Sequence, residues 1–183
     1  TYRFLGNGDR ISVNTGTGTF NNTGTLEVSG AISNQVNSVS FTNSGGTLNS
    51  GIGTLTFNTG GSHSGSVTIS GTAVNLAGGT HSFADSTTVS GQINVAGASA
   101  SFGTVTASGL VNFTSGAMNV TTGDTLTLNG GMNWSSSGAI NGPGTLSLPS
   151  GKTLAMTGGS DHALSGVTFN NAGTTTSNIA GAQ

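Results

Sequence analysis

The sequence repeats itself about every twenty residues from Leu55 onward, and each repeat carries similar short apolar–polar–apolar triplets. Five successive triplets start at Val74, Ile93, Val111, Met132 and Leu154, at nearly regular intervals. A repeat of this length cannot bury a core alone, and it is typical of a solenoid in which neighbouring repeats stack. The repeat constrains the architecture more strongly than any other feature of the sequence.

Each repeat contains three such strand signals, because apolar and polar residues alternate over three to five positions. The first row is Ile11/Val13, Ile32, Leu55/Phe57, Val74/Leu76, Ile93/Val95, Val111/Phe113, Met132/Trp134 and Leu154/Met156. The second row is Thr19/Phe20, Val39/Phe41, His63, His81/Phe83, Ala100/Phe102, Met118/Val120, Ile140 and Leu164. The third row is Leu26/Val28, Leu48, Val67/Ile69, Val89, Val105/Ala107, Leu126/Leu128, Leu146/Leu148 and Val167/Phe169.

Short glycine-containing segments separate the three signals, and glycine lets a chain turn a corner within two or three residues. We therefore predict an all-β fold: a parallel β-helix, or β-solenoid, with three short strands per turn, about 20 residues per turn and about eight turns. The preference of parallel crossovers favours a right-handed coil. We expect residues 1–10 to be an N-terminal capping segment and residues 11–183 to be the β-solenoid, as part of a longer array.

The composition excludes several classes of partner. Only eight side chains are charged and the formal net charge is −2, so the chain offers no basic surface to nucleic acid. No stretch reaches the ~20 apolar residues of a membrane-spanning helix, so we expect no membrane insertion of this segment. The chain has no cysteine, which excludes disulfides and cysteine-ligated metals. Low net charge and regularly placed apolar residues favour a folded chain over disorder.

Outward positions of the third row carry hydroxyl groups that could form a regular surface. Methyl and hydroxyl groups at such spacing can hold ordered water, so this row is a candidate binding surface for ice. A simpler interpretation is structural, because threonine suits an exposed strand and stacked threonines support adjacent turns. The residues of this candidate row are Thr68, Thr88, Thr104, Thr106, Thr125, Thr127, Ser147 and Thr168.

Outward positions of the first row carry asparagine in four successive repeats, at Asn75, Asn94, Asn112 and Asn133. Stacked amides form hydrogen-bonded ladders along parallel strands, so we predict a structural asparagine ladder. A glycan-binding strip is the other interpretation, although aromatic side chains that would stack on sugars are missing.

Three histidines lie at similar corners, and two of them, His63 and His81, follow near-identical lead-in sequences in consecutive repeats. We expect these two to stack on neighbouring turns and to form a hydrogen bond. Two imidazoles are too few for a metal site, which needs three or four ligands. Glycosidase and serine-hydrolase arrangements of side chains are also missing. We therefore predict no catalytic residues, no metal and no cofactor.

Several segments resemble repeats of bacterial surface adhesins, namely autotransporter passenger domains and filamentous-haemagglutinin-type β-helices. The residues that carry this resemblance are 53–57 (GTLTF), 124–130 (DTLTLNG), 144–148 (GTLSL) and 167–173 (VTFNNAG). The resemblance covers residues 11–173 and implies export, a rigid stalk or filament, and location outside the cell or at the bacterial surface. None of the residues that bind ligands in those families has a match here.

Three functions follow as expectations. The first is a non-enzymatic structural β-solenoid of an adhesin, stalk or fibre, whose partners would be a host surface or a glycan. The second is an ice-binding β-solenoid that uses the hydroxyl row. The third is a self-assembling filament, in which copies of the protein pair end to end through their open terminal strands.

Overall fold

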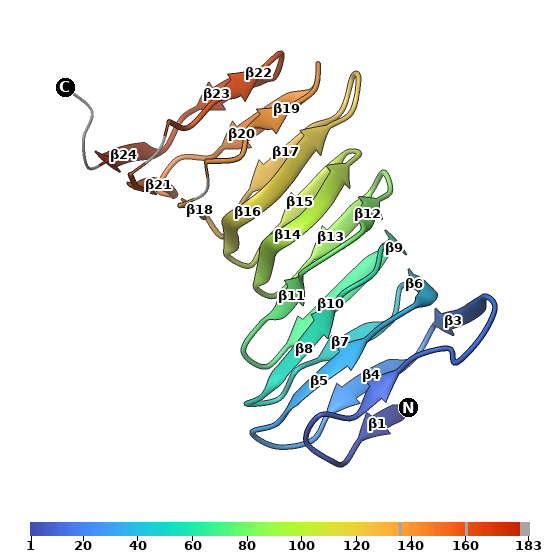
Figure 1. The fold of residues 1–183 in the computed structure, drawn as a ribbon. Coiled ribbons are helices and arrows are strands. Elements are labelled where there is room, and N and C mark those ends of the chain that lie inside the picture. The colour runs from blue at the N-terminus through green and yellow to red at the C-terminus, as the bar shows by residue number, and fades with distance from the viewer. Residues whose placement is uncertain (136, 160, 180–183) are drawn as a thin grey trace.

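Alternating apolar and polar residues build this chain into a stack of short parallel strands. The computed structural model describes residues 1–135, 137–159 and 161–179, and it shows an all-β parallel β-solenoid of about eight turns. Each turn has about 21 residues and three strands, as the sequence predicts. The turns stack in order from the N-terminus to the C-terminus, so segments one repeat apart lie side by side (Figure 1).

The strands of the third row form a nine-stranded parallel sheet. Its members, in spatial and in sequence order, are β1 (Tyr2–Phe4), β4 (Thr25–Val28), β7 (Thr47–Asn49), β10 (Ser66–Ser70), β13 (Thr87–Val89), β15 (Val105–Ala107), β17 (Thr125–Leu128), β20 (Thr145–Leu148) and β23 (Thr168–Asn171). Each strand pairs with the equivalent strand of the next turn, so the main-chain hydrogen bonds run along the solenoid axis.

The first and second rows together form a 15-stranded sheet. The first row consists of β2 (Arg10–Ile11), β5 (Ser33–Val36), β8 (Thr54–Phe57), β11 (Val74–Leu76), β14 (Ile93–Phe102), β16 (Val111–Val120), β18 (Met132–Trp134), β21 (Thr153–Gly158) and β24 (Thr174–Ile179). The second row adds β3 (Gly18–Asn22), β6 (Val39–Ser44), β9 (Gly61–Ser64), β12 (Thr80–Phe83), β19 (Ile140–Asn141) and β22 (Leu164–Ser165).

Two turns join the first and second rows in a single strand. Strands β14 and β16 each have ten residues, and they pair in parallel from Ile93 to Phe102 with an irregular register near Ala96. The chain bends there at Gly97 and Gly116, whose φ angles are 128° and 95°. A Cβ atom on Gly116 would lie 2.1 Å from the carbonyl oxygen of the turn below, so only glycine fits this bend.

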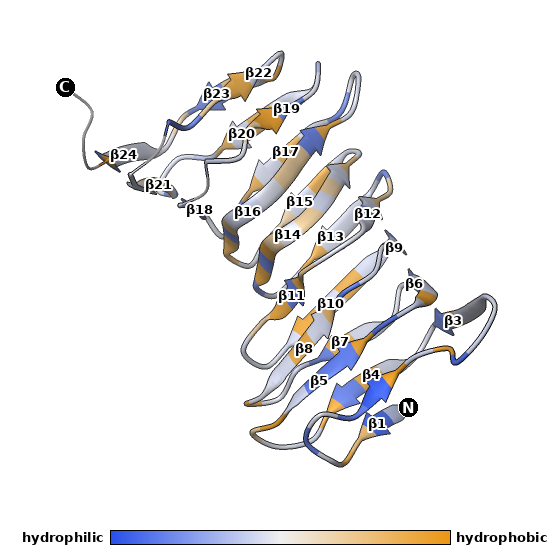
Figure 2. Cartoon of the chain, viewed as in Figure 1, coloured by the Kyte–Doolittle hydropathy of each residue, from blue (hydrophilic) through white to orange (hydrophobic). Residues whose placement is uncertain are grey.

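The interior is one continuous apolar core. The first-row residues Val74, Ile93, Val111 and Met132 stand opposite one another in register, and each is at most 2% exposed. Figure 2 shows the alternation of hydropathy along β14 and β16 that produces this arrangement. Side chains of the same parity face inward on every turn, so stacking buries them against the turns above and below.

The second turn differs from the predicted first row. The sequence pattern placed Ile32 inward, but Asn34 and Val36 stand opposite Leu55 and Phe57. Both residues are fully buried, while Ile32 lies just before the strand and is only partly buried. The side-chain amide of Asn34 donates a 3.1 Å hydrogen bond to a backbone carbonyl of the N-terminal segment, while its buried Oδ1 has no partner among the described residues.

The N-terminal segment contributes regular strands to the stack. Tyr2–Phe4 forms β1 and pairs in parallel with β4, and Phe4 is buried in the core. Arg3 forms an ion pair with Glu27 on the neighbouring turn, with 2.9 Å between Nε and Oε2. The capping role of residues 1–10 stays a prediction. Residues 180–183, which the predicted solenoid segment includes, lie outside the described residues.

A buried hydroxyl group generates a first prediction. Thr87 occupies the inward column of Val105, is 1% exposed, and its Oγ1 has no hydrogen-bond partner among the described residues. Replacing Thr87 with valine keeps the shape and removes an unpaired buried polar group, so we expect about 1 kcal/mol of added stability. Chemical denaturation measures this change. Thr88→Val on the adjacent exposed position is the control, and an equal gain there, or a loss at Thr87, would contradict the interpretation.

Candidate functional site

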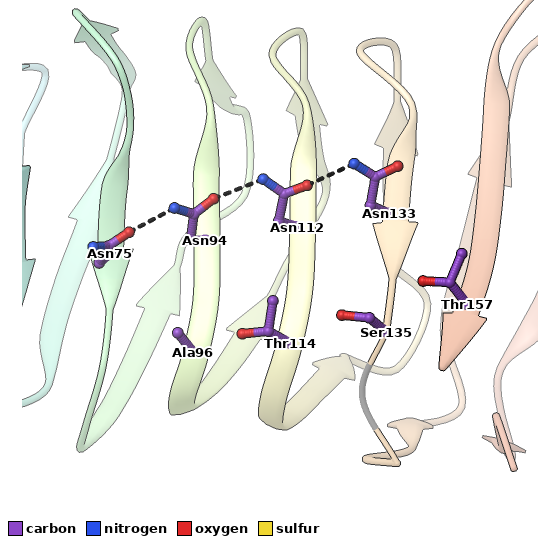
Figure 3. A pocket seen from close by; sticks show the side chains of 8 residues that line it. All are labelled: Asn75, Asn94, Ala96, Asn112, Thr114, Asn133, Ser135 and Thr157. Atoms are coloured by element: carbon purple, nitrogen blue, oxygen red, sulfur yellow. Dashed lines mark hydrogen bonds between the residues drawn. The ribbon is translucent and has the colours of Figure 1, made fainter. Parts of the chain in front are cut away.

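The four asparagines of the first row stand in register on β11, β14, β16 and β18. Nδ2 of Asn94 donates to Oδ1 of Asn75 at 2.6 Å, Asn112 donates to Asn94 at 2.8 Å, and Asn133 donates to Asn112 at 2.9 Å. Figure 3 shows these three hydrogen bonds and the common orientation of the amides. Since Ala155 stands opposite Asn133 on the next turn, the run of asparagines ends there.

An open groove with a volume of about 530 Å³ lies over the asparagine ladder, and we call it the asparagine groove. One side is formed by the four ladder residues, and the other side consists of Ala96, Thr114, Ser135 and Thr157 (Figure 3). Ala96 and Thr114 lie in β14 and β16 just before the bends at Gly97 and Gly116, Ser135 directly follows β18, and Thr157 lies in β21. The sequence pattern predicts the ladder but not the groove, because alternation shows which residues face outward and not the depth of the surface between them.

The predicted hydroxyl row is in register over four turns. Thr88 stands opposite Thr106, Thr106 opposite Thr127, and Thr127 opposite Ser147. These residues are exposed or half-buried, and the apolar residues between them face the core. The distance between successive members along the axis is about 4.8 Å, the spacing of neighbouring strands.

Thr68 does not belong to this column. It stands opposite Thr47, and Ser66 is the residue opposite Thr88. Ser66 and Thr88 are further apart in the sequence than Thr88 and Thr106 are. Both pairs nevertheless stand in register on adjacent turns. The turn length therefore varies along the stack, and aligning repeats by motif alone shifted Thr68 by two positions.

Thr168 lies in a second column that runs parallel to the first. It stands opposite Thr145, which in turn stands opposite Thr125, while Asn170 is the residue opposite Ser147. The threonines of this second column and those of the first are two residues apart on each strand, a distance of about 6.6 Å. The sheet thus presents two columns of hydroxyl groups, and asparagine replaces threonine at the C-terminal end of one of them.

Thr104 lies at the corner before β15 and joins two carboxylates of different turns. Its backbone N–H donates to Oδ1 of Asp85 at 3.0 Å, and its hydroxyl donates to Oδ1 of Asp124 at 2.8 Å. The Thr121 hydroxyl also donates to Asp124. These hydroxyl groups, that of Thr121 first, hold the pKa of Asp124 below its usual value. The carboxylates therefore link neighbouring turns at an exposed corner.

His63 and His81 form a hydrogen-bonded pair inside the core. Nε2 of His63 lies 3.1 Å from Nδ1 of His81, the ring planes differ by 20°, and the residues are 2% and 0% exposed. The two rings stack on neighbouring turns and are hydrogen-bonded, as expected, although His63 stands opposite Phe83 and His81 opposite Gly61. The pair is therefore diagonal across two turns.

Burial lowers the pKa of both imidazoles. The pKa of His63 falls to about 3, mainly through loss of solvation and also through the nearby His81. The pKa of His81 falls to about 4 for the same first reason, although backbone groups of Gly78 and Thr59 partly oppose the change. Both rings are therefore neutral at pH 7, which suits the apolar surroundings of Phe57 and Phe83.

His162 and Trp134 meet at a separate position. Nε2 of His162 lies 2.8 Å from the carbonyl oxygen of Trp134, and the two rings are in edge contact at 4.8 Å. The indole ring is buried, so it offers no platform to an external ligand. Among the described residues, no three histidine, aspartate or glutamate side chains come close enough together to hold a metal ion. No helix in the described segments has the length and apolar character to cross a membrane.

Comparison with protein-family models, with curated proteins and with solved structures gave no match to this chain.

The asparagine ladder generates a second prediction. Asn112 takes part in two ladder hydrogen bonds and Asn133 in one, so Asn112→Ala should cost more stability than Asn133→Ala. Each hydrogen bond contributes about 0.5–1.5 kcal/mol. We therefore expect losses of about 1–3 and about 0.5–1.5 kcal/mol in chemical denaturation. Equal losses, or none in either variant, would contradict a stabilising ladder.

The histidine pair generates a third prediction. Below pH 6.5 both histidines bind protons in the unfolded chain, whereas in the folded core they stay neutral until the pH is much lower. The free energy of unfolding is therefore highest above pH 6.5 and falls as the pH drops toward 3. The slope should approach about 1.4 kcal/mol per histidine for each pH unit. Denaturation of the double variant His63→Phe/His81→Leu should show little dependence between pH 6.5 and 5. An unchanged slope in that variant would assign the acid sensitivity to other groups.

Proposed function

We propose that this chain is a rigid, non-enzymatic segment of an adhesin, stalk or fibre located outside the cell or at a bacterial surface. The observation that carries the proposal is the uninterrupted stack of about eight turns, in which every described turn pairs with the next. Such a stack acts as a stiff rod, because each turn is hydrogen-bonded and packed against both neighbours. Loops between strands are short and add no separate structure.

The surface chemistry supports the same proposal. Only 4% of residues are charged, and serine, threonine, asparagine and glycine occupy most outward positions. A cysteine-free rod of this type needs no disulfides, because its core is continuous along the axis. The likeness of its repeats to those of surface adhesins points to the same setting. The carboxylates at the corner link turns, and the buried imidazoles face the core, so neither is arranged for catalysis.

Surface location is tested on the source cells. Antibodies raised against the folded 183-residue chain should label intact cells, and protease added outside should remove the label because the chain is exposed there. A cytosolic protein serves as the control and should stay protected. Labelling that appears only after the cells are permeabilised would contradict the proposal.

Ice binding is the second candidate, and the two hydroxyl columns on one sheet favour it. The parallel sheet holds these groups about 4.8 Å apart along the axis and about 6.6 Å apart across it. A surface of this kind can order a water layer through its methyl and hydroxyl groups. The first column extends over four turns, from Thr88 to Ser147, and the second over three turns, from Thr125 to Thr168.

Thermal hysteresis separates the two candidates. If the hydroxyl columns bind ice, Thr106→Tyr or Thr127→Tyr should abolish hysteresis because the bulky ring breaks the flat surface, while Ser82→Tyr on β12 should keep it. If the chain is a structural rod, the unmodified protein shows no hysteresis and Thr106→Tyr leaves attachment of the parent protein intact. Hysteresis that survives both threonine substitutions would exclude these columns as the ice-binding surface.

A further inference from the structure

The asparagine groove differs from the rest of the surface in shape and chemistry. Its lining residues come from five successive turns, from Asn75 on β11 to Thr157 on β21, and the asparagine ladder occupies the first four of these turns. Its lining consists of four asparagines, two threonines, one serine and one alanine, so amides and hydroxyls alternate with small methyl groups and no side chain is charged or aromatic. The absence of cations among the lining residues disfavours phosphates and acidic peptides, and the absence of large apolar groups disfavours lipids.

The ladder leaves hydrogen-bonding capacity unused. A primary amide has two N–H donors and an oxygen with two acceptor sites. Asn112 uses one donor toward Asn94 and one acceptor site toward Asn133, so one donor and one acceptor site remain. Asn133 keeps its second donor and its whole oxygen, because no further asparagine follows it. The groove therefore repeats an unused donor once per turn, at an interval of about 4.8 Å.

We propose that the asparagine groove binds an uncharged, hydroxyl-rich polysaccharide chain that lies along the solenoid axis. Each sugar hydroxyl can both donate and accept a hydrogen bond. It can therefore pair with the unused donors and acceptors of the ladder amides and of the Thr114 and Ser135 hydroxyls. An extended glycan repeats its hydroxyl groups at intervals comparable with one turn of the solenoid. The neutral lining matches a neutral polymer.

A peptide strand is a poorer fit to this groove. Peptides that bind to sheets add a strand at an edge, where backbone N–H and C=O groups are free. The backbone beneath the groove is already paired on both sides, since β14 and β16 each lie between neighbouring strands. Only side chains remain for recognition. Amides and hydroxyls recur from turn to turn, which suits a polymer whose units also repeat.

The ladder also prepares the groove for binding. Three hydrogen bonds between 2.6 and 2.9 Å fix the amides of Asn75, Asn94, Asn112 and Asn133 in one orientation (Figure 3). Side chains that are already ordered lose little entropy when a ligand binds. Since no aromatic ring stacks on the sugar, each contact is weak, and affinity should rise with the number of sugar units in the groove.

Side-chain amide resonances test the proposal directly. The full chain, labelled with nitrogen-15, is titrated with cellohexaose, xylohexaose and mannohexaose, and with a hexagalacturonate as the charged counterpart. We expect at least one neutral hexasaccharide to shift the side-chain N–H₂ signals of Asn94, Asn112 and Asn133 saturably. The monosaccharides and the acidic hexamer should leave these signals unchanged. No saturable shift with any neutral hexasaccharide at millimolar concentration would overturn the proposal.

Matched variants locate the site. Thr114→Tyr fills the groove without removing any amide of the ladder and should weaken binding by about tenfold or more. Ser82→Tyr places the same ring on an outward position of β12 and should bind as the unmodified protein does, and circular dichroism confirms that both fold. Equal affinity of the two variants would show that the glycan binds elsewhere and would refute the assignment. Labelling of intact cells tests the proposed surface role separately, because loss of glycan binding leaves location unchanged.

Discussion

Hydrogen bonding between equivalent strands of successive turns is the interaction on which the whole structure depends. Each strand is short, in many cases three or four residues, and would be unstable alone. Pairing on both sides supplies every inner strand with partners, and it also fixes which residue stands opposite which. A shift of one residue would turn the apolar side chains outward, so burial and register enforce each other.

Register then determines what the surface and the interior present. Because equivalent residues stack, a residue type that recurs at the same position in successive turns forms a column. Apolar side chains form columns inside, asparagine amides form one on one face, and hydroxyls form others on another face. Several polar residues are exceptions inside the core, and some of them form hydrogen bonds there while the Thr87 hydroxyl forms none with the described residues. Asn34 bonds to the backbone, and His63 and His81 bond to each other.

The sequence predicted the architecture and the asparagine ladder because both depend on local alternation and on a repeated residue. It predicted exact register less well. Turns differ in length, so Thr68 and Thr168 align two positions away from the expected column. Asn34 escaped notice because a polar inward residue carries no apolar signal. The groove could not be predicted because alternation shows which residues face outward and not the depth of the surface between them.

Disulfide cross-linking between turns tests the register most directly. The chain has no native cysteine, so only the introduced pair can form a disulfide. Residues in register on neighbouring strands lie about 4.8 Å apart, within the Cα distance that a disulfide spans. The pair Thr106→Cys/Thr127→Cys should therefore oxidise readily. The pair Thr106→Cys/Thr125→Cys, diagonal by two residues and about 8 Å apart, should not. Efficient bonding of the diagonal pair, with none in the first, would contradict the stacking described for this protein.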